Sequence, residues 1–244
     1  MSKRKAILRV TIAALVIWGA AICTCAQDKN RAVKQNTREQ TPKETAPVVK
    51  TSNAEDVNYS YEFQKSDFFL RHIVITHDGR GRGQISFERQ GDIEPIIEPV
   101  ELSESARSRI IALWDALRFL DSKTDYQSER QYPHLGTMRL SMKQGTRERV
   151  AEFNWTNDSN VKALVEEYRR ASNQAIFIFD ITVARENQPL NSPKLLDTLD
   201  RYLTSNQLSD PQQLIPLLRE LNTDERLPLM ARNQAGRILK KIEK

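Results

Sequence analysis

Residues 68–89 read FFLRHIVITHDGRGRGQISFER, and this stretch decides the fold class. Its first part, 68–76, is rich in β-branched and aromatic residues, which favour a β-strand. The sequence HDG at 77–79 is typical of a turn, and a second run follows in which Ile85 and Phe87 alternate with polar residues. The stretch therefore predicts a β-hairpin with a glycine-rich loop.

A second hairpin is expected farther along the chain. Residues 136–143 and 147–155 both alternate apolar and polar side chains, and a Gln-Gly pair separates them. Residues 93–102 carry two prolines, which confine them to an edge strand or an extended connection because proline has no backbone N–H to donate. The chain thus supplies two hairpins to one antiparallel sheet.

Two helices are expected to pack on this sheet. Ser103 is a suitable N-cap for the first, and apolar side chains follow at helical spacing, namely Ile110, Leu113, Trp114 and Leu117. The second helix is expected over 159–187. Its part 176–183 (IFIFDITV) also favours a strand, which is the alternative, but no glycine or proline separates it from the helix before it.

The rest of the chain, 188–244, is predicted to form a helical tail with leucine-rich stripes. The expected fold class is α+β: an antiparallel sheet of two hairpins packed with two helices, followed by an all-α C-terminal tail. Within the tail, 211–243 resembles one HEAT-type helical repeat, and the matching residues are Pro216, Asp224, Arg232, Ala235 and Leu239. The resemblance implies a packing or interaction role and no catalytic residue. The layout of 59–187 is similar to small exported α+β domains of bacteria without an assigned activity, and this implies no chemistry.

The N-terminus has the layout of a secretory signal peptide. A basic stretch at 2–9 precedes an apolar run at 10–22, and small residues follow up to Ala26. Three outcomes stay open: cleavage before Gln27, retention as a membrane anchor, or acylation at Cys25 as in a bacterial lipoprotein. In each case we expect the folded part to lie beyond a membrane, in the periplasm or outside the cell, and to meet the membrane through this segment alone.

The charge distribution argues against nucleic acid as a partner. The chain holds 37 Lys and Arg and 32 Asp and Glu, a net charge of +5, and residues 1–26 hold four basic residues and no acidic one. Residues 27–58 contain no aromatic residue, leucine or isoleucine, which predicts a disordered tether. The expected folded part therefore has balanced charges and no general attraction to a polyanion. Another envelope protein is the expected partner.

Loop 77–83 is the first candidate site. Arg80, Gly81 and Arg82 place two cationic side chains on a glycine-rich backbone, and free amides with arginines suit a phosphate or a carboxylate. A plain hairpin tip is the alternative, because glycine and aspartate also dominate turns for backbone reasons.

Loop 121–134 is the second candidate site. Its candidate cleft residues are Asp125, Tyr126, Tyr132 and His134, which carry side chains able to bind a polar molecule. A connecting loop without a ligand is the alternative, although its length is at the upper end for a loop without structure of its own.

No metal, cofactor or catalytic residue is expected. His72, His77 and His134 are the only histidines, and both cysteines lie in the N-terminal segment, so the ligands of a zinc site are lacking. We therefore expect an exported, non-enzymatic envelope protein of interaction or scaffolding type, and enzymatic activity stays open. The alternative is a small-ligand or anion-binding protein, or a hydrolase, with a site between loops 77–83 and 121–134.

Overall fold

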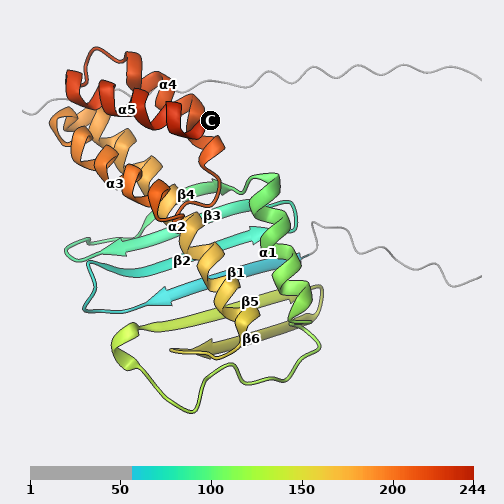
Figure 1. Ribbon diagram of the computed structural model, residues 1–244. Helices are drawn as coiled ribbons and strands as arrows, with labels where there is room; N and C mark the ends of the chain where they lie inside the picture. The colour runs from blue at the N-terminus through green and yellow to red at the C-terminus, as the bar shows by residue number, and fades with distance from the viewer. Residues whose placement is uncertain (1–56) are drawn as a thin grey trace, which may run out of the picture. The chain divides into compact units, whose positions relative to one another are not determined.

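The computed structural model describes residues 57–244, so the expected signal or anchor segment, Cys25 and nearly all of the expected tether lie outside the described residues. The described part contains one six-stranded antiparallel sheet and five α-helices, and its C-terminal end is helical (Figure 1). The expectation of a mixed α and β fold that ends in helices is therefore confirmed.

The strands of the sheet lie in the order β4-β3-β2-β1-β5-β6. They are β1 (Val57–Gln64), β2 (Leu70–Asp78), β3 (Arg82–Arg89), β4 (Ile96–Glu101), β5 (Thr137–Gln144) and β6 (Arg147–Phe153). The expected hairpins are β2–β3 and β5–β6, and β1 pairs with both β2 and β5 between them. The proline-containing strand β4 lies at one edge of the sheet, where a missing backbone donor is tolerated.

Strand β1 lies inside the sheet but was not among the expected elements. Its inward side chains, Val57, Tyr59, Tyr61 and Phe63, are all buried, while the side chains between them face the other side of the sheet. Tyr61 pairs with Ile75 on one side and with Leu140 on the other. The central strand therefore sets the register of both hairpins, and its period-two alternation is the signal that the sequence offers.

Two helices, α1 (Glu104–Ala116) and α2 (Ser159–Asn187), cross the same face of the sheet (Figure 1). Ser103 caps α1 as expected, because its hydroxyl accepts a hydrogen bond from the amide of Ala106 at 3.2 Å. Helix α2 spans the whole expected range, so the segment 176–183 is helical despite its strand propensity. Its amides continue the hydrogen bonding of the helix before it, and Phe177 and Ile181 are buried on one side.

The tail contains three further α-helices behind short 3-10 turns. These are α3 (Ser192–Thr204), α4 (Ile215–Thr223) and α5 (Leu229–Ile242), with turns η3 (Pro189–Asn191) and η4 (Pro211–Leu214). Their buried side chains form a second core of leucine, isoleucine and alanine, which begins inside α2 at Phe177. One long helix therefore contributes to two cores: the aromatic-rich core under the sheet and the aliphatic core of the tail.

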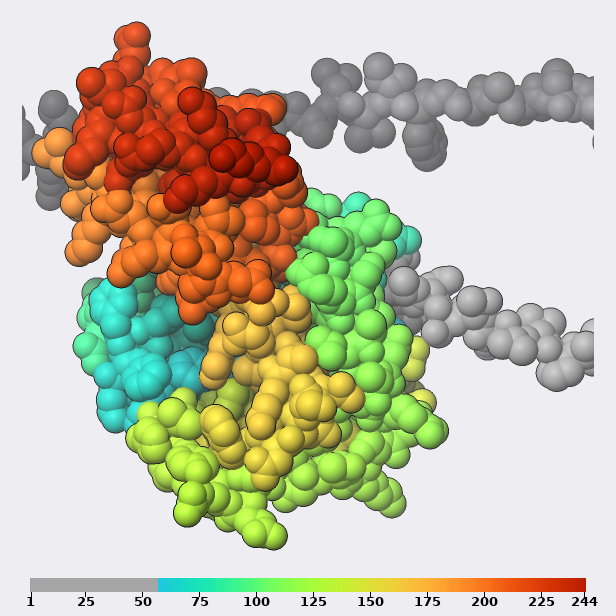
Figure 2. Space-filling model, in the orientation of Figure 1, coloured from blue at the N-terminus to red at the C-terminus, as the bar shows by residue number. Residues whose placement is uncertain are grey.

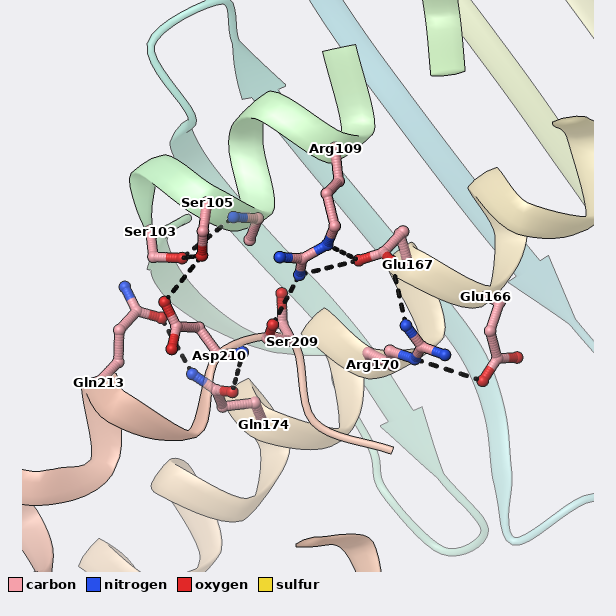
Figure 3. A network of polar contacts seen from close by, with 11 residues as sticks. Ser103, Ser105, Arg109, Glu166, Glu167, Arg170, Gln174, Ser209, Asp210 and Gln213 are labelled. Atoms are coloured by element: carbon pink, nitrogen blue, oxygen red, sulfur yellow. Dashed lines mark hydrogen bonds and ion pairs between the residues drawn. The ribbon is translucent and has the colours of Figure 1, made fainter. Parts of the chain in front are cut away.

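A network of polar contacts connects the tail to the helices on the sheet (Figure 3). Arg109 of α1 bonds Glu167 of α2 through Nε at 3.1 Å and the Ser209 carbonyl through Nη2 at 2.7 Å. The Asp210 side chain accepts a hydrogen bond from the Ser105 hydroxyl, and the Asp210 amide donates to Gln174. The segment before α4 is thus tied to both helices, which fixes the tail on the sheet.

The turn between α4 and α5 is held by an ionic contact. Asp224 accepts hydrogen bonds from Arg226 at 2.7 Å and from Arg185 of α2 at 2.5 Å. These two guanidinium groups hold the pKa of the Asp224 carboxyl well below its usual range, and the Arg226 hydrogen bond is the larger cause. Within 57–244, no helix combines the length and the apolar character needed to span a bilayer.

Candidate functional site

The loop proposed for anion binding is a tight hairpin tip. Asp78 Oδ1 accepts hydrogen bonds from the backbone amides of Arg80 at 2.8 Å and of Arg82 at 2.9 Å. Gly81 has φ +81°, which an L side chain adopts only with strain, and this explains the glycine at that position. The backbone amides of Arg80 and Arg82, which were expected to bind an external anion, therefore bind the Asp78 carboxylate of the loop itself.

The second candidate loop lines an open hollow of about 590 Å³, which we call the polar hollow. Its walls are formed by residues 124–130, Tyr132 and the segment 155–158. Asp125 and Tyr132 border the hollow, whereas the Tyr126 ring is buried beneath it and carries the guanidinium of Arg149 at 5.1 Å.

His134 lies outside the polar hollow. It belongs to the 3-10 turn η2 (Pro133–Leu135), is exposed, and contacts the Tyr132 ring edge-on at 5.9 Å between centroids. The structure therefore brings Asp125, Tyr126 and Tyr132 together around one hollow, with His134 beside it.

The two candidate loops do not form a common site. Asp78, at the base of the first loop, pairs with Asn58 at the start of β1, whereas Gln64 at the end of β1 pairs with Thr137, just after η2. Six residues of extended strand separate these two ends by about 20 Å. The β2–β3 loop, which contains Arg80, therefore lies at the opposite end of the sheet from η2, which contains His134. Figure 1 shows these two ends of the sheet.

The buried histidine has a structural arrangement. His77 Nδ1 lies 2.7 Å from the Asp78 carbonyl, and Nε2 lies 2.9 Å from the Tyr168 hydroxyl. The Tyr168 hydroxyl accepts a hydrogen bond from Trp114 Nε1 at 3.0 Å. Since a carbonyl only accepts, Nδ1 carries the proton and Tyr168 donates to Nε2. Burial lowers the pKa of His77 and raises the pKa of Tyr168, so the network is neutral.

The third histidine lies on the other face of the sheet. His72 Nε2 is 2.9 Å from Glu62 and Nδ1 is 3.3 Å from Glu88, which also binds Arg71 at 3.0 Å. Both ring nitrogens are thus directed at carboxylates. Among residues 57–244, no group of three or more histidine, cysteine and acidic side chains is arranged to hold a metal ion.

A second hollow of about 590 Å³ lies on the helix-bearing face of the sheet, and we call it the apolar hollow. Its floor consists of apolar side chains from four different strands, namely Tyr61, Phe63, Ile73, Met138 and Phe153. Its walls come from Phe68 before β2, Leu135 of η2, Trp155 after β6 and the first half of α2. In Figure 2, the surface is hollowed to the left of α2, between its yellow atoms and the cyan and yellow-green atoms of the sheet.

A glycine allows the floor to close beside η2. Gly136 has φ +85°, and a Cβ at this position would lie 2.8 Å from the Gln64 carbonyl and 2.8 Å from the Phe63 ring. Any other residue would therefore push β5 away from β1 at the point where the hollow begins. The backbone reaches its place at the end of the hollow because this position has no side chain.

Helix α2 supplies the charged side of the apolar hollow. Lys162, Glu166 and Arg169 line it at helical spacing, so they lie on one side of the helix. Glu166 lies 3.7 Å from Arg170 on the same helix, which offsets part of its charge, because Arg170 also binds Glu167 at 3.0 Å. Within the described part of the chain, neither Lys162 nor Arg169 lies within ion-pair distance of a carboxylate.

The two cations instead contact the aromatic and sulfur-containing wall. The Lys162 ammonium lies 5.4 Å from the centre of the Trp155 ring, and Arg169 Nη2 lies 3.8 Å from Met138 Sδ. Burial raises the pKa of the Tyr61 hydroxyl, and the positive charge of Arg169 acts in the opposite direction. The arrangement presents a concave apolar surface beside two positive charges, which suits a molecule with an apolar part and an acidic group.

The apolar hollow was not predicted from the sequence, because its lining comes from segments between residues 61 and 169. The only sequence signals are the alternation in β1 and the i, i+4, i+7 spacing of Lys162, Glu166 and Arg169, and each also occurs in ordinary sheets and helices. A scan against models of protein families and a search of curated proteins both give no match to the chain.

Proposed function

We propose that this protein is a non-enzymatic binding protein that acts beyond a membrane and receives the apolar part of another molecule in the apolar hollow. The observation that supports the proposal is the hollow itself, whose floor of aromatic and aliphatic side chains stays open to solvent at its mouth. Its volume of about 590 Å³ falls within the range of small-molecule sites, and such sites are mostly apolar with few polar groups.

The exposed aromatic residues around the mouth support the same proposal. Phe68 and Trp155, which line the hollow, are 43% and 39% exposed. Phe69, next to Phe68 in the chain, is 68% exposed. Large apolar side chains gathered at the surface are typical of binding sites, because their burial on binding releases water. A ligand in the hollow covers part of this surface.

A neutral solvent-sensitive dye such as Nile red tests the proposal. The full-length protein should bind the dye with a rise in fluorescence, and Leu135→Trp should reduce the binding at least severalfold because the larger ring occupies the hollow from its wall. Leu190→Trp is the matched control, since Leu190 is 83% exposed in η3, in the tail. Equal dye binding by the native protein and by the Leu135 variant would contradict the proposal.

The N-terminal segment carries the proposed location. A signal peptide or anchor at 1–26 and a tether at 27–58 place the folded part beyond the membrane and keep membrane contact within the first segment. The mass of the mature protein tests this part, because a chain that starts at Gln27 excludes both an anchor and acylation of Cys25. A mature chain that retains Met1 and stays in the cytoplasm contradicts the proposed location.

A second candidate function is an interaction of the tail with another envelope protein. Leu229 and Met230 are 63% and 61% exposed at the start of α5, within the segment that resembles a HEAT-type repeat. Adjacent exposed apolar side chains favour contact with a partner. If the tail binds a partner, Leu229→Glu with Met230→Glu should abolish its cross-linking to that partner and leave dye binding in the apolar hollow unchanged.

A further inference from the structure

We infer that the apolar hollow takes a single long-chain carboxylate, a fatty acid or a molecule of the same chemistry, whose carboxylate binds Arg169 while its chain lies on the aromatic floor. This inference rests on the proposed function and specifies the class of its ligand. It depends on the charged side chains of α2 that border the hollow. The binding of an apolar group alone does not require these charges.

Arg169 is the cation that reaches farthest over the floor. Its guanidinium lies against the Met138 thioether of the floor at 3.8 Å. A thioether is a weak acceptor, and guanidinium carries five N–H donors, so this side chain retains donors for a ligand. A planar guanidinium binds a carboxylate through two parallel hydrogen bonds, which places the acid group at the edge of the floor.

Lys162 adds a second positive charge at the other end of the α2 wall. It lies seven residues before Arg169, which corresponds to about 10 Å along the helix axis and the same side of the helix. Its ammonium rests on the Trp155 ring at 5.4 Å. At this separation, Lys162 attracts an anion through space and does not share the two oxygens that Arg169 binds, so its contribution is the smaller one.

The charge balance favours an anion with one charge. Two cations border the hollow, and the one carboxylate between them, Glu166, is paired with Arg170 at 3.7 Å. Glu166 still lies on the same wall, so a ligand with two or more negative charges meets more repulsion there than a monoanion. A cationic amphiphile lacks any available carboxylate on this wall.

The concave shape favours one molecule over a membrane surface. The floor is enclosed by Phe68, Leu135, Trp155 and α2, so a chain enters between walls and is covered on several sides. A bilayer is a broad convex or flat surface and touches only the exposed rim, namely Phe68 and Trp155 with Lys162. Membrane binding is therefore the competing outcome of the test.

Calorimetric titration of the full-length protein with decanoate, decanol and a decyl ammonium salt, each below its aggregation concentration, tests the inference. Decanoate should bind at least tenfold more tightly than decanol, because a charged hydrogen bond adds to the same apolar burial. The ammonium salt should bind more weakly than decanol. Lengthening the carboxylate from eight to ten carbons should tighten binding by up to about fourfold for each added CH₂.

Substitution of the two cations separates their roles from folding. Arg169→Ala should weaken decanoate binding at least tenfold and leave decanol binding unchanged, and Arg169→Lys should restore part of the loss. Lys162→Ala should weaken decanoate binding by a smaller factor, and this factor should shrink in high salt. Arg130→Ala is the matched control, because Arg130 borders the polar hollow, and decanoate binding should be unchanged.

Each outcome bears on a different statement. Equal binding of decanoate and decanol overturns the carboxylate inference and leaves the proposed function standing, whereas binding of neither, together with no dye binding, overturns both. Sedimentation with phosphatidylcholine and phosphatidylglycerol vesicles is the remaining arm. Binding to vesicles without binding of monomeric decanoate overturns the inference in favour of a membrane surface.

Discussion

The polar and the apolar hollow have the same volume, about 590 Å³, and share Trp155 and Thr156 as a common border, yet they differ in lining. The polar hollow is formed by one continuous loop and the segment at 155–158. The apolar hollow is formed by side chains of four strands, two turns and a helix. Volume alone therefore does not indicate a site, because apolar burial contributes binding free energy only where the lining is apolar.

A pair of amide side chains separates the two hollows. Asn154 borders the apolar hollow. Its side-chain oxygen accepts hydrogen bonds from Gln127 Nε2 at 3.2 Å and from the Tyr132 backbone amide at 3.1 Å. The backbone amide of Asn154 donates to Gln127 Oε1 at 2.9 Å. The loop of the polar hollow is thus attached to the sheet through Asn154, in addition to the hydrogen bonds from the Ser128 amide to the Trp155 carbonyl at 2.9 Å and from Arg149 to the Thr124 carbonyl at 2.6 Å. We expect the apolar hollow to keep its shape and the polar hollow to depend on this attachment.

The largest expected effect concerns the floor of the apolar hollow. Phe153 is 2% exposed, so Phe153→Ala should lower the free energy of unfolding by about 3–5 kcal/mol through lost burial and a new cavity. Glu129→Ala, in the polar hollow, should change it by less than about 0.5 kcal/mol because that residue is exposed. Urea denaturation measures both. Similar losses for the two variants would remove the distinction between the hollows.

A smaller effect is expected at the border between the hollows. Asn154→Ala removes the acceptor of the Tyr132 amide and should lower the free energy of unfolding by about 1–3 kcal/mol. Hydrogen exchange should speed up over residues 127–132 and stay unchanged in β1. Asn157→Ala is the control, since Asn157 is an exposed residue of the polar hollow. Unchanged exchange in the loop would show that other contacts hold it.

The shared wall offers an optical readout. Occupation of the apolar hollow by decanol should shift the emission of Trp155 to shorter wavelength, because a 39% exposed indole loses contact with water. Trp114 is 1% exposed and should not respond, so Trp155→Phe should abolish the shift. Glu129→Ala alters an exposed residue of the polar hollow and should leave the shift intact. A shift that disappears with Glu129→Ala would place the ligand in the polar hollow.

The smallest effect, a pH dependence, separates fold stability from binding. Burial lowers the pKa of His77 in the folded protein, whereas the unfolded histidine has a pKa of about 6.5. Protonation therefore favours the unfolded state, so stability is fully present above pH 6.5 and falls as the pH is lowered from there. Denaturation curves between pH 5 and 8 should show this slope.

The control for the pH dependence is a substitution at the same residue. His77→Asn should flatten the slope in that pH range, although it lowers stability because the Tyr168 hydroxyl loses its partner. Decanol binding above pH 7 should be unchanged, since His77 pairs with Tyr59 near the start of β1, away from the apolar hollow. A slope that persists in the variant would assign the pH dependence to another group.

Much of the fold could be predicted because its signals are local. The hairpin of 68–89, the Ser103 cap and the long helix over 159–187 each depend on residues close together in sequence. Strand β1 was missed although its alternation is visible, because it follows a polar segment without an obvious turn before it. The strand propensity of 176–183 was overridden by the continuous helix, a common effect of tertiary context.

The candidate site was less predictable for a physical reason. The consecutive polar residues of loop 121–134 predict a site, and part of this loop does line a hollow. The apolar hollow brings together Tyr61, Leu135 and Arg169, which are far apart in sequence. Their meeting depends on the pairing of β1 with β5 and on where α2 crosses the sheet, and a single sequence contains neither directly.

Helix α2 joins the two cores of residues 57–244. Its 29 residues form an uninterrupted helix of about 44 Å. The first half forms a wall of the apolar hollow, and the second half contributes Phe177 and Ile181 to the core of the tail. A rod without a hinge transmits a tilt at one end to the other. A shorter chain that ends after α2 exposes Phe177 and Ile181 to solvent and is expected to aggregate. The tail therefore covers the apolar side of the second half of α2.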